Sequence, residues 1–254
     1  MTRPKTAGRS RIDWLSDRII RALLGTMLML PYRWRVPATG WVMQKIIAPL
    51  VGYNRRSLKN LTLIYPDMSS HEKRVIAGQV ANNFGRSFIE NYSTRELLSR
   101  HLDTPLSGDG VSALQQARET GRAVILVSGH FGNYEVPRAT LIARGYDVSG
   151  LYRPASNRYF DDHYAETMKV LGSPMFAQGR QGTADFIRHL KRGGMAVLLG
   201  DRHVNKGAVL PFLGQPAMTA ISAAQMALKY DALLIPFYGI RHQNGLDFDI
   251  RIEA

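Results

Sequence analysis

The spacing of apolar residues first becomes regular near residue 69, where it predicts a long helix. Ser69 and Glu72 match a capping box, in which each side chain bonds to the other residue's backbone N–H. Apolar side chains then recur at every fourth position, at Ile76, Val80, Phe84 and Phe88. This spacing indicates one face of an amphipathic helix. We expect that helix to run from residue 69 to about residue 98.

Beyond residue 120, short apolar runs alternate with helical segments. The runs predict strands at 123–127, 148–152, 195–199 and 233–238. The segments between them predict helices at 134–144, 158–171, 181–192 and 220–230. Such alternation is typical of an α/β fold with a mainly parallel sheet flanked by helices. The turn Asn244-Gly245 and the alternating pattern over 246–252 predict that the last strand pairs antiparallel with its predecessor, as a C-terminal hairpin.

Length and composition indicate a folded domain with a sizeable core. The chain has 254 residues and 45% of them are hydrophobic, which excludes a disordered protein. It has no cysteine, which excludes a disulfide scaffold, a thiolate zinc site, a cysteine nucleophile and an iron–sulfur protein. The histidines lack metal-ligand spacing, and Gly108-Asp109-Gly110 precedes a strand where a dinucleotide fingerprint would follow one. We therefore expect neither a metal nor an organic cofactor.

Positive charge is concentrated in residues 1–60. They hold twelve Lys and Arg but only two Asp, so they carry +10 of the formal net charge of +13. Apolar stretches and three tryptophans, Trp14, Trp34 and Trp41, are interleaved with these cations. Such a segment suits an anionic membrane interface, where each Lys or Arg contributes about 1 kcal/mol. We expect 1–60 to form a helical membrane-associating extension and 61–254 to form the main α/β domain.

Three charged residues, Asp17, Arg18 and Arg21, disfavour a membrane span between Trp14 and Tyr32, because each charge at bilayer depth costs about 2.5–3.5 kcal/mol. A position flat on the membrane is favoured, and a short tilted anchor stays open. A solvated basic tail followed by two core helices is the other interpretation. Nucleic acid is not expected as a partner, because lipid-like side chains at residues 27–30 separate the cations.

The clearest chemical pattern lies between residues 123 and 135. A buried strand leads into Gly129-His130, a turn with Gly132 and Asn133 follows, and Glu135 falls in the first turn of a helix. In open α/β sheets, ligands bind beyond the carboxyl ends of the strands, and glycines let the backbone approach a substrate closely. We expect His130 and Glu135 to form a general-base pair in which the carboxylate orients the imidazole. A serine nucleophile is not expected, because the Gly-x-Ser-x-Gly elbow is absent.

At these residues the chain resembles the bacterial lipid A late acyltransferases, the lauroyl and myristoyl transferases, which are a branch of the lysophospholipid acyltransferase-like group. The family's His-x-x-x-x-Asp/Glu signature stands here as His130 and Glu135, inside Ser-Gly-His-Phe-Gly-Asn-Tyr-Glu. Further blocks follow the family's order, at 60–66, at Tyr152-Arg153-Pro154, and from Gly200-Asp201 to 211–219. The resemblance covers roughly residue 18 to the end of the chain.

The resemblance implies a lysophospholipid acyltransferase-like fold with 61–254 as the catalytic domain. It also implies transfer of a fatty acyl chain from acyl carrier protein to a hydroxyl of a lipid A precursor, at the cytoplasmic face of the inner membrane. His130 would be the base and Glu135 its orienter. The expected substrate-binding residues are Arg153 and Asp201, which match positions around the family's active site, together with Gly129, Asn133 and Arg202.

Two choices stay open at this point. The acceptor could be a lipid A precursor or a lyso-lipid, because the base acts on the hydroxyl alone, and the donor thioester could be on carrier protein or on coenzyme A. A third interpretation is a non-catalytic membrane-binding protein. Family members usually carry a clearer N-terminal anchor and run longer at the C-terminus, so we expect an interfacial attachment and a short C-terminus here.

Overall fold

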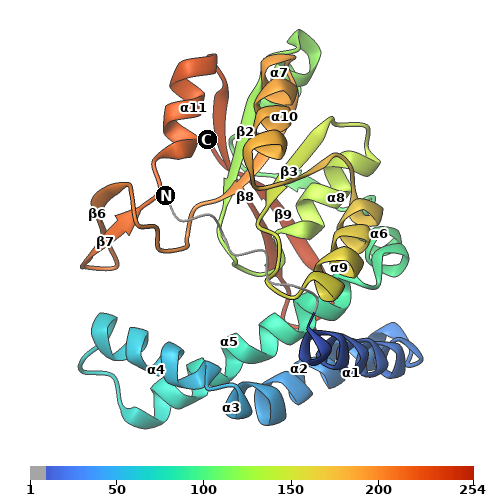
Figure 1. The fold of residues 1–254 in the computed structure, drawn as a ribbon. Coiled ribbons are helices and arrows are strands. Elements are labelled where there is room, and N and C mark those ends of the chain that lie inside the picture. Colours follow the sequence, from blue (N-terminus) through green and yellow to red (C-terminus); the bar gives the residue numbers. More distant parts are fainter. Residues whose placement is uncertain (1–9) are drawn as a thin grey trace.

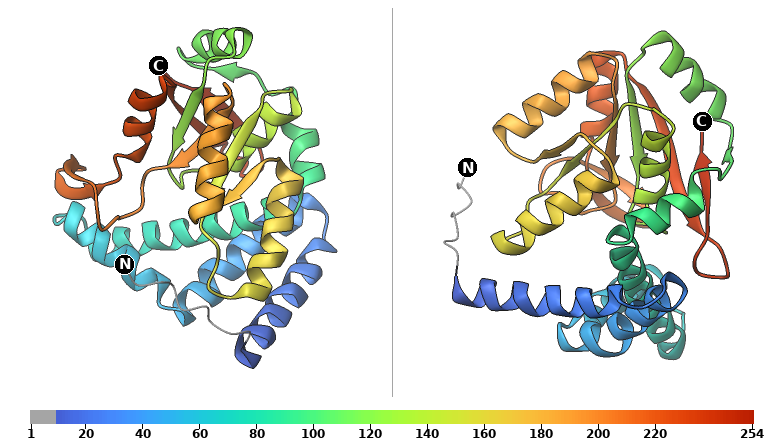
Figure 2. Two further views of the ribbon diagram at one scale, coloured as in Figure 1. Left: turned by 45° about the horizontal axis from the view of Figure 1, so that its top comes forward. Right: turned by 90° about the vertical axis from the view of Figure 1, so that its right-hand side faces the viewer.

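The computed structural model describes residues 10–254 and shows a helical platform at one end of a mostly parallel sheet (Figure 1). Arg3, Lys5 and Arg9, which contribute to the predicted basic extension, lie outside the described residues. The platform consists of α1 (Arg11–Leu28), α2 (Tyr32–Val42), a π-helical turn η1 (Met43–Ile47), α3 (Ala48–Leu50), α4 (Tyr53–Ile64) and α5 (Ser70–Asn91). Figure 2 shows that these elements stay together below the sheet in both further views.

Helix α5 is the longest element of the platform and runs beneath the sheet. The predicted capping box is confirmed, because the Ser69 hydroxyl accepts from the N–H of Glu72 and the Glu72 carboxylate accepts from the N–H of Ser69. The helix ends at Asn91, earlier than predicted, and α6 (Thr94–His101) follows. The Ser93 and Thr94 hydroxyls donate to carbonyls in the last turn of α5, and such bonds compete with helix continuation.

The buried face of α5 is built from small residues. At Gly85 a Cβ atom would lie 2.6 Å from the Cβ of Met43 and 2.8 Å from the carbonyl oxygen of Thr39, so a glycine is required for the close approach to α2 and η1. By contrast, Val80 and Phe84, which carry the predicted apolar periodicity, are 43% and 49% exposed. The apolar stripe therefore lies on a different face of the helix from its main packing contact.

The sheet confirms the predicted topology. Its strand order is β1 (Leu106–Ser107), β9 (Phe248–Ile252), β8 (Leu233–Arg241), β2 (Val124–Ser128), β5 (Met195–Leu199), β3 (Val148–Tyr152) and β4 (Met175–Ala177). Neighbouring strands are parallel except β8 and β9, which form the predicted antiparallel hairpin. The sequence did not predict β1 and β4, which are too short to show a period. A separate antiparallel pair, β6 (Ala208–Phe212) and β7 (Gln215–Thr219), was also not predicted.

Helices cover both faces of the sheet, as the alternation of elements predicted. The covering helices are α7 (Val111–Thr120), α8 (Glu135–Ala143), α9 (Arg158–Leu171), α10 (Arg180–Lys191) and α11 (Ser222–Tyr230). Side chains of β2 alternate between two core clusters: Val124 and Leu126 pack with Leu141 of α8, and Ile125 packs with Phe186 of α10. The core is thus a sheet between two helical layers.

Within residues 10–254, none of the helices combines the length and the apolar character needed to cross a membrane. Helix α1 instead has two unlike sides. Ile12, Leu15, Ile19 and Leu23 are about half exposed or more, and their spacing places them on one face. Asp17, on the opposite side, is fully buried, and its carboxylate accepts from the Arg21 guanidinium at 2.8 Å.

Candidate active site

The turn after β2 brings His130 to the carboxyl end of the sheet, where the end of β5 lies next to it. Ser128, the last residue of β2, pairs with Leu199, the last residue of β5, and the N–H of Gly200 donates to the carbonyl of Ser128 at 2.9 Å. This register relates residues that are 71 positions apart. The same offset relates His130 to Asp201, so parallel pairing places these two residues level with each other beyond the strand ends.

His130 and Asp201 are joined by two hydrogen bonds. Nδ1 of the imidazole lies 2.8 Å from Oδ1 of the carboxylate, and the backbone N–H of His130 donates to Oδ2 at 2.7 Å. The imidazole is also edge-on to the ring of Tyr134, at 5.4 Å between centroids. The histidine is therefore held by its backbone and its ring, while 46% of its side chain stays exposed.

The charge of Asp201 decides which nitrogen of His130 carries the proton. Partial burial raises the pKa of Asp201, but hydrogen bonds from the ring and backbone of His130 outweigh it and leave the pKa below its ordinary value. The carboxylate is therefore ionised at neutral pH and can only accept. Nδ1 must then carry the hydrogen, which leaves the lone pair on Nε2 of the neutral imidazole. This arrangement is that of a general base oriented by a carboxylate.

Glu135 does not form the expected pair with His130. Its carboxylate accepts from Nε of Arg138 at 2.7 Å, and both side chains are almost completely buried. Arg138 also donates to the carbonyls of Gly172 and Met168 at the end of α9. The reason for the difference is the helix itself: residues three apart lie on one face, so Glu135 is directed along α8 and away from the turn.

The glycines of the turn allow close approach to other parts of the protein, Gly132 to backbone and Gly129 to a side chain. Gly132 has φ +55°, and a Cβ there would lie 1.9 Å from the carbonyl oxygen of Gly239 in β8. A Cβ at Gly129 would lie 3.2 Å from the Asp201 carboxylate. These two positions let the turn fit between β8 and Asp201.

Asn133 was expected at the substrate, but it lies inside the protein and is 1% exposed. Its amide nitrogen donates to Oε2 of Glu90 at 3.0 Å and to Oδ1 of Asn91 at 3.3 Å. Its amide oxygen accepts from the N–H of Glu135, the first residue of α8, at 3.0 Å. The side chain therefore connects the turn to α5 and to the start of the next helix.

Arg153 and Arg202 lie at the same end of the sheet as His130. Arg153 follows β3 and Arg202 follows β5, and both side chains are exposed. Asp201, which was expected to bind substrate, instead pairs with His130. The two guanidinium groups thus add positive charge beside the carboxyl ends of β3 and β5.

An aromatic row lies along α5 and α9 and reaches the first residue of α4; it is defined here as Tyr53, Phe84, Phe88, Tyr92, Phe160 and Tyr164. Phe88 stacks on Phe160 and Tyr164 at 6.3 and 6.2 Å between centroids, and Phe84 stacks on Phe88 at 6.3 Å. In the sequence, the spacing of the α5 part of this row indicated a helix only. A second spacing of four, Phe160 to Tyr164, was the signal that could have identified its partner.

The aromatic row runs past the His130 turn. Asn83 and Ser87, which neighbour Phe84 and Phe88 on α5, donate to the carbonyl of Gly132 at 2.9 Å each. The His130 turn and an apolar surface are thus carried by directly connected parts of the fold.

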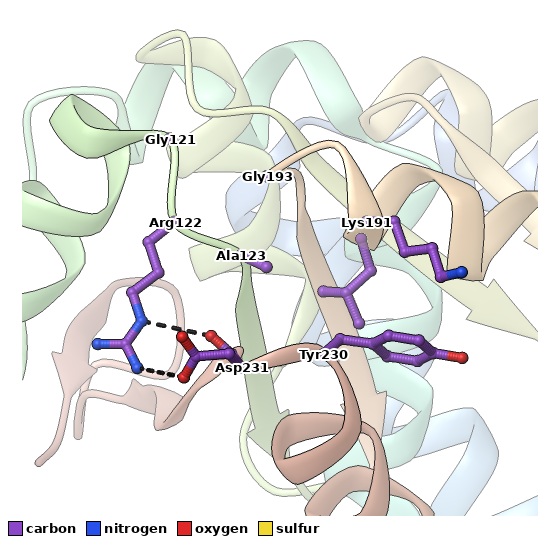
Figure 3. A pocket seen from close by; sticks show the side chains of 8 residues that line it. Gly121, Arg122, Ala123, Lys191, Gly193, Tyr230 and Asp231 are labelled. Carbon is purple, nitrogen blue, oxygen red and sulfur yellow. Dashed lines mark hydrogen bonds and ion pairs between the residues drawn. The ribbon is translucent and has the colours of Figure 1, made fainter.

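A hollow of about 280 Å³ lies at the opposite, amino end of the strands (Figure 3). It is lined by Gly121, Arg122, Ala123, Leu190, Lys191, Gly193, Tyr230 and Asp231. Arg122 is paired with Asp231 at 3.1 Å, and Nζ of Lys191 lies 5.4 Å from the centre of the Tyr230 ring. Its lining residues precede β2, β5 and β8, so the hollow is not part of the His130 site. In the part of the chain that the structure describes, no group of three or more His, Asp or Glu is placed to hold a metal ion.

Comparison with known proteins gives one family. A model of the family described as bacterial lipid A biosynthesis acyltransferase matches residues 5–254. A lipid A biosynthesis acyltransferase of Haemophilus influenzae is 26% identical over 250 residues, which are 95% of this chain and 76% of the relative. The lipid A biosynthesis lauroyltransferase of Escherichia coli is 24% identical over 199 residues, which are 76% of this chain and 63% of the relative.

Proposed function

We propose, since the chain belongs to the bacterial lipid A biosynthesis acyltransferase family and is an acyltransferase, that it moves a fatty acyl chain from an acyl thioester to a hydroxyl of a lipid A precursor. The single observation that carries this proposal is the His130–Asp201 pair at the carboxyl end of β2 and β5. It supplies a base for a hydroxyl proton. The mainly parallel sheet with helices on both faces supports the proposal that the chain has the fold of the lysophospholipid acyltransferase-like group.

The proposed reaction passes through a tetrahedral intermediate. Nε2 of His130 takes the proton of the acceptor hydroxyl as its oxygen attacks the thioester carbonyl. The C–S bond then breaks, and the imidazolium returns the proton to the leaving thiolate, so that an ester and a free thiol result. Asp201 stabilises the imidazolium that exists between the two transfers.

The negative charge on the carbonyl oxygen needs a donor. Within the turn, the N–H of His130 is used by Asp201 and the N–H of Asn133 is used by the carbonyl of Gly239. The guanidinium of Arg202, next to Asp201 in the chain, is the proposed donor, with Arg153 binding anionic groups of the donor or acceptor. Glu135 supports the site indirectly through Arg138.

The aromatic row is the proposed surface for the acyl chain. Its half-exposed member Phe84 lies one turn from Ser87, which bonds to the His130 turn. The rings of Phe84, Phe88 and Phe160 offer an apolar face, and the hydroxyl of Tyr92 is already bonded to Nδ1 of His163 at 3.0 Å. A chain lying along α5 would end with its thioester near His130.

The exposed apolar face of α1 supports attachment to the cytoplasmic face of the inner membrane. Ile12, Leu15, Ile19 and Leu23 line that face, and Trp34 and Trp41 of α2 are 60% and 54% exposed. An amphipathic helix with flanking cations binds an anionic interface without crossing it. Acyl carrier protein, an acidic protein, is the proposed donor because the cations beside His130 suit it.

The test is acyl transfer from labelled acyl carrier protein to lipid A precursors and to lyso-lipids, with acyl coenzyme A as the second donor. His130→Ala should lower the rate by at least about 10²–10⁴, the range for general-base catalysis. Asp201→Asn should lower it too, because an amide cannot stabilise the imidazolium.

Asp249→Asn is the matched control, because Asp249 forms a 2.8 Å pair with His242 at the β8–β9 hairpin, away from the turn. If acyl chains were transferred to lyso-lipids and not to lipid A precursors, the acceptor would be a lyso-lipid and not the proposed lipid A precursor. Full activity in folded His130→Ala would overturn the proposal.

A further inference from the structure

A buried ion pair lies directly behind the His130 turn. Glu90 of α5 is fully buried, and Arg241, at the end of β8, contacts both of its carboxylate oxygens. The bond from Nη2 to Oε2 measures 2.8 Å. Asn133 of the turn is the third partner, since its amide nitrogen donates to the same Oε2 at 3.0 Å. The pair is therefore shared between the platform, the sheet and the turn.

The Glu90 carboxylate orients the Asn133 amide together with Oδ1 of Asn91, because both accept from its nitrogen, at 3.0 and 3.3 Å. An ionised carboxylate only accepts, so the NH₂ of Asn133 must face it. The amide oxygen is then directed to the N–H of Glu135, 3.0 Å away, where α8 begins. If the amide turned over, its nitrogen would face that N–H and both groups would be donors. Glu90 thereby sets the backbone that follows His130.

Arg241 also contacts two side chains of α5 that bond to the other side of the turn. Its Nε donates to Oδ1 of Asn83 at 2.9 Å, and its Nη2 lies 3.3 Å from Oγ of Ser87. Asn83 and Ser87 in turn donate to the carbonyl of Gly132. The ion pair therefore orients every side chain that donates to the Gly132 carbonyl among the described residues.

We infer that Glu90 and Arg241 are positioning residues for acyl transfer. They hold the turn in the position in which the imidazole of His130 contacts both Asp201 and the substrate. The inference rests on the proposed role of His130. Neither residue is placed to contact substrate, since the side chains of Glu90 and Arg241 are only 0% and 12% exposed. A buried ion pair is no more stabilising than well-packed apolar residues of the same size, so specific orientation is the gain that such a pair offers.

The test exchanges a donor and an acceptor across one hydrogen bond. Glu90→Gln keeps the shape but removes the charge and places an NH₂ group opposite the donors of Arg241 and Asn133, so the Asn133 amide is held less firmly. Displacement of a catalytic group by about 1 Å can cost about 10²-fold in rate. We expect kcat to fall by about that factor, with KM for donor and acceptor within about twofold.

The double variant Glu90→Gln/Asn133→Asp restores the bond in the opposite sense. The new carboxylate accepts from the glutamine amide and from the N–H of Glu135, and the net charge is unchanged. We expect the kcat of the double variant to be at least about tenfold higher than that of Glu90→Gln. Glu96→Gln is the matched control, because Glu96 pairs with Arg35 at 2.6 Å without contacting the turn. It should keep the wild-type kcat.

Two further measurements separate positioning from folding and from the proposed function. Ser87→Ala removes one of two donors to Gly132, and we expect a smaller loss, in kcat alone, at an unchanged melting temperature. The Nδ1 resonance of His130, assigned by its absence in His130→Ala, should move in Glu90→Gln and stay in Glu96→Gln.

Wild-type kcat in Glu90→Gln, or a double variant no more active than the single one, would overturn the inference. If His130→Ala stays active, the proposed function fails instead, and the resonance still tests whether Glu90 positions the ring.

Discussion

The buried Glu135–Arg138 pair leads to a prediction about why Glu135 matters. Both side chains are at most 3% exposed, and the Glu135 carboxylate is the one anionic partner of Arg138 among residues 10–254. Glu135→Gln leaves the guanidinium without an anionic partner, so that only neutral acceptors remain: the new amide oxygen and the carbonyls of Gly172 and Met168. Removing one partner of a buried ion pair costs about 3–5 kcal/mol. We therefore expect a loss of stability of that size.

That loss corresponds to a fall in melting temperature of about 6–20 °C, because 1 kcal/mol shifts the midpoint by about 2–4 °C in a protein of this size. Circular dichroism during heating, in the same detergent for each variant, measures it. Removal of both charges in Glu135→Leu/Arg138→Met should recover more than half of the loss, because no buried charge is left alone.

Activity distinguishes this structural role from a catalytic one. Well below its melting point, Glu135→Gln should retain activity within about tenfold of wild type, whereas Asp201→Asn should not. A Glu135→Gln variant with the wild-type melting temperature and activity lowered more than 10²-fold would refute the reasoning, because Glu135 would then act on the reaction and not on the fold.

Four other substitutions test the fold. Gly85→Leu should destabilise the protein by about 1–3 kcal/mol or more in urea unfolding, because its Cβ would lie 2.6 Å from Met43, whereas Gly25→Ala, with nothing within 4 Å of its Cβ, should be neutral or stabilising. Ser69→Ala should cost about 1 kcal/mol by removing the α5 capping box, measured in the same way. Burial lowers the pKa of His101, although Asp247 opposes it, so its contribution to stability is present above the unfolded value of about 6.5 and is lost as pH falls through the folded value. His101→Gln should flatten the pH dependence of urea unfolding below about pH 6.5, and an unchanged slope would contradict this assignment.

Local patterns were sufficient for most of the fold. The central strands and the helices between them were predicted within a few residues, because periodicity and turn residues are properties of neighbouring positions. The strand, turn and helix around His130 were predicted for the same reason. The two- and three-residue strands β1 and β4 were not, because pairing with neighbours defines them rather than their own pattern.

The partner of His130 needed information that one sequence does not contain. Glu135 was the nearest carboxylate along the chain, but helix geometry directs it to Arg138. Asp201 was identified as a site residue, yet its role depends on β5 being the neighbour of β2, which is a property of the sheet order. The Glu90–Arg241 pair was missed for a similar reason, since it joins residues 151 positions apart.

The offset of 71 residues that relates Ser128 to Leu199 and His130 to Asp201 links the chemistry to the assembly of the sheet. A chain in which β5 has not yet docked beside β2 has an imidazole without its carboxylate, so the pair can form only after this long-range contact is made. Insertions in the loops between the intervening helices leave the alignment intact. Deletion of a single residue within β5 would shift Asp201 by one position and turn its side chain to the other face of the sheet. The pairing of β2 with β5 thus determines how the proposed base and its carboxylate are aligned.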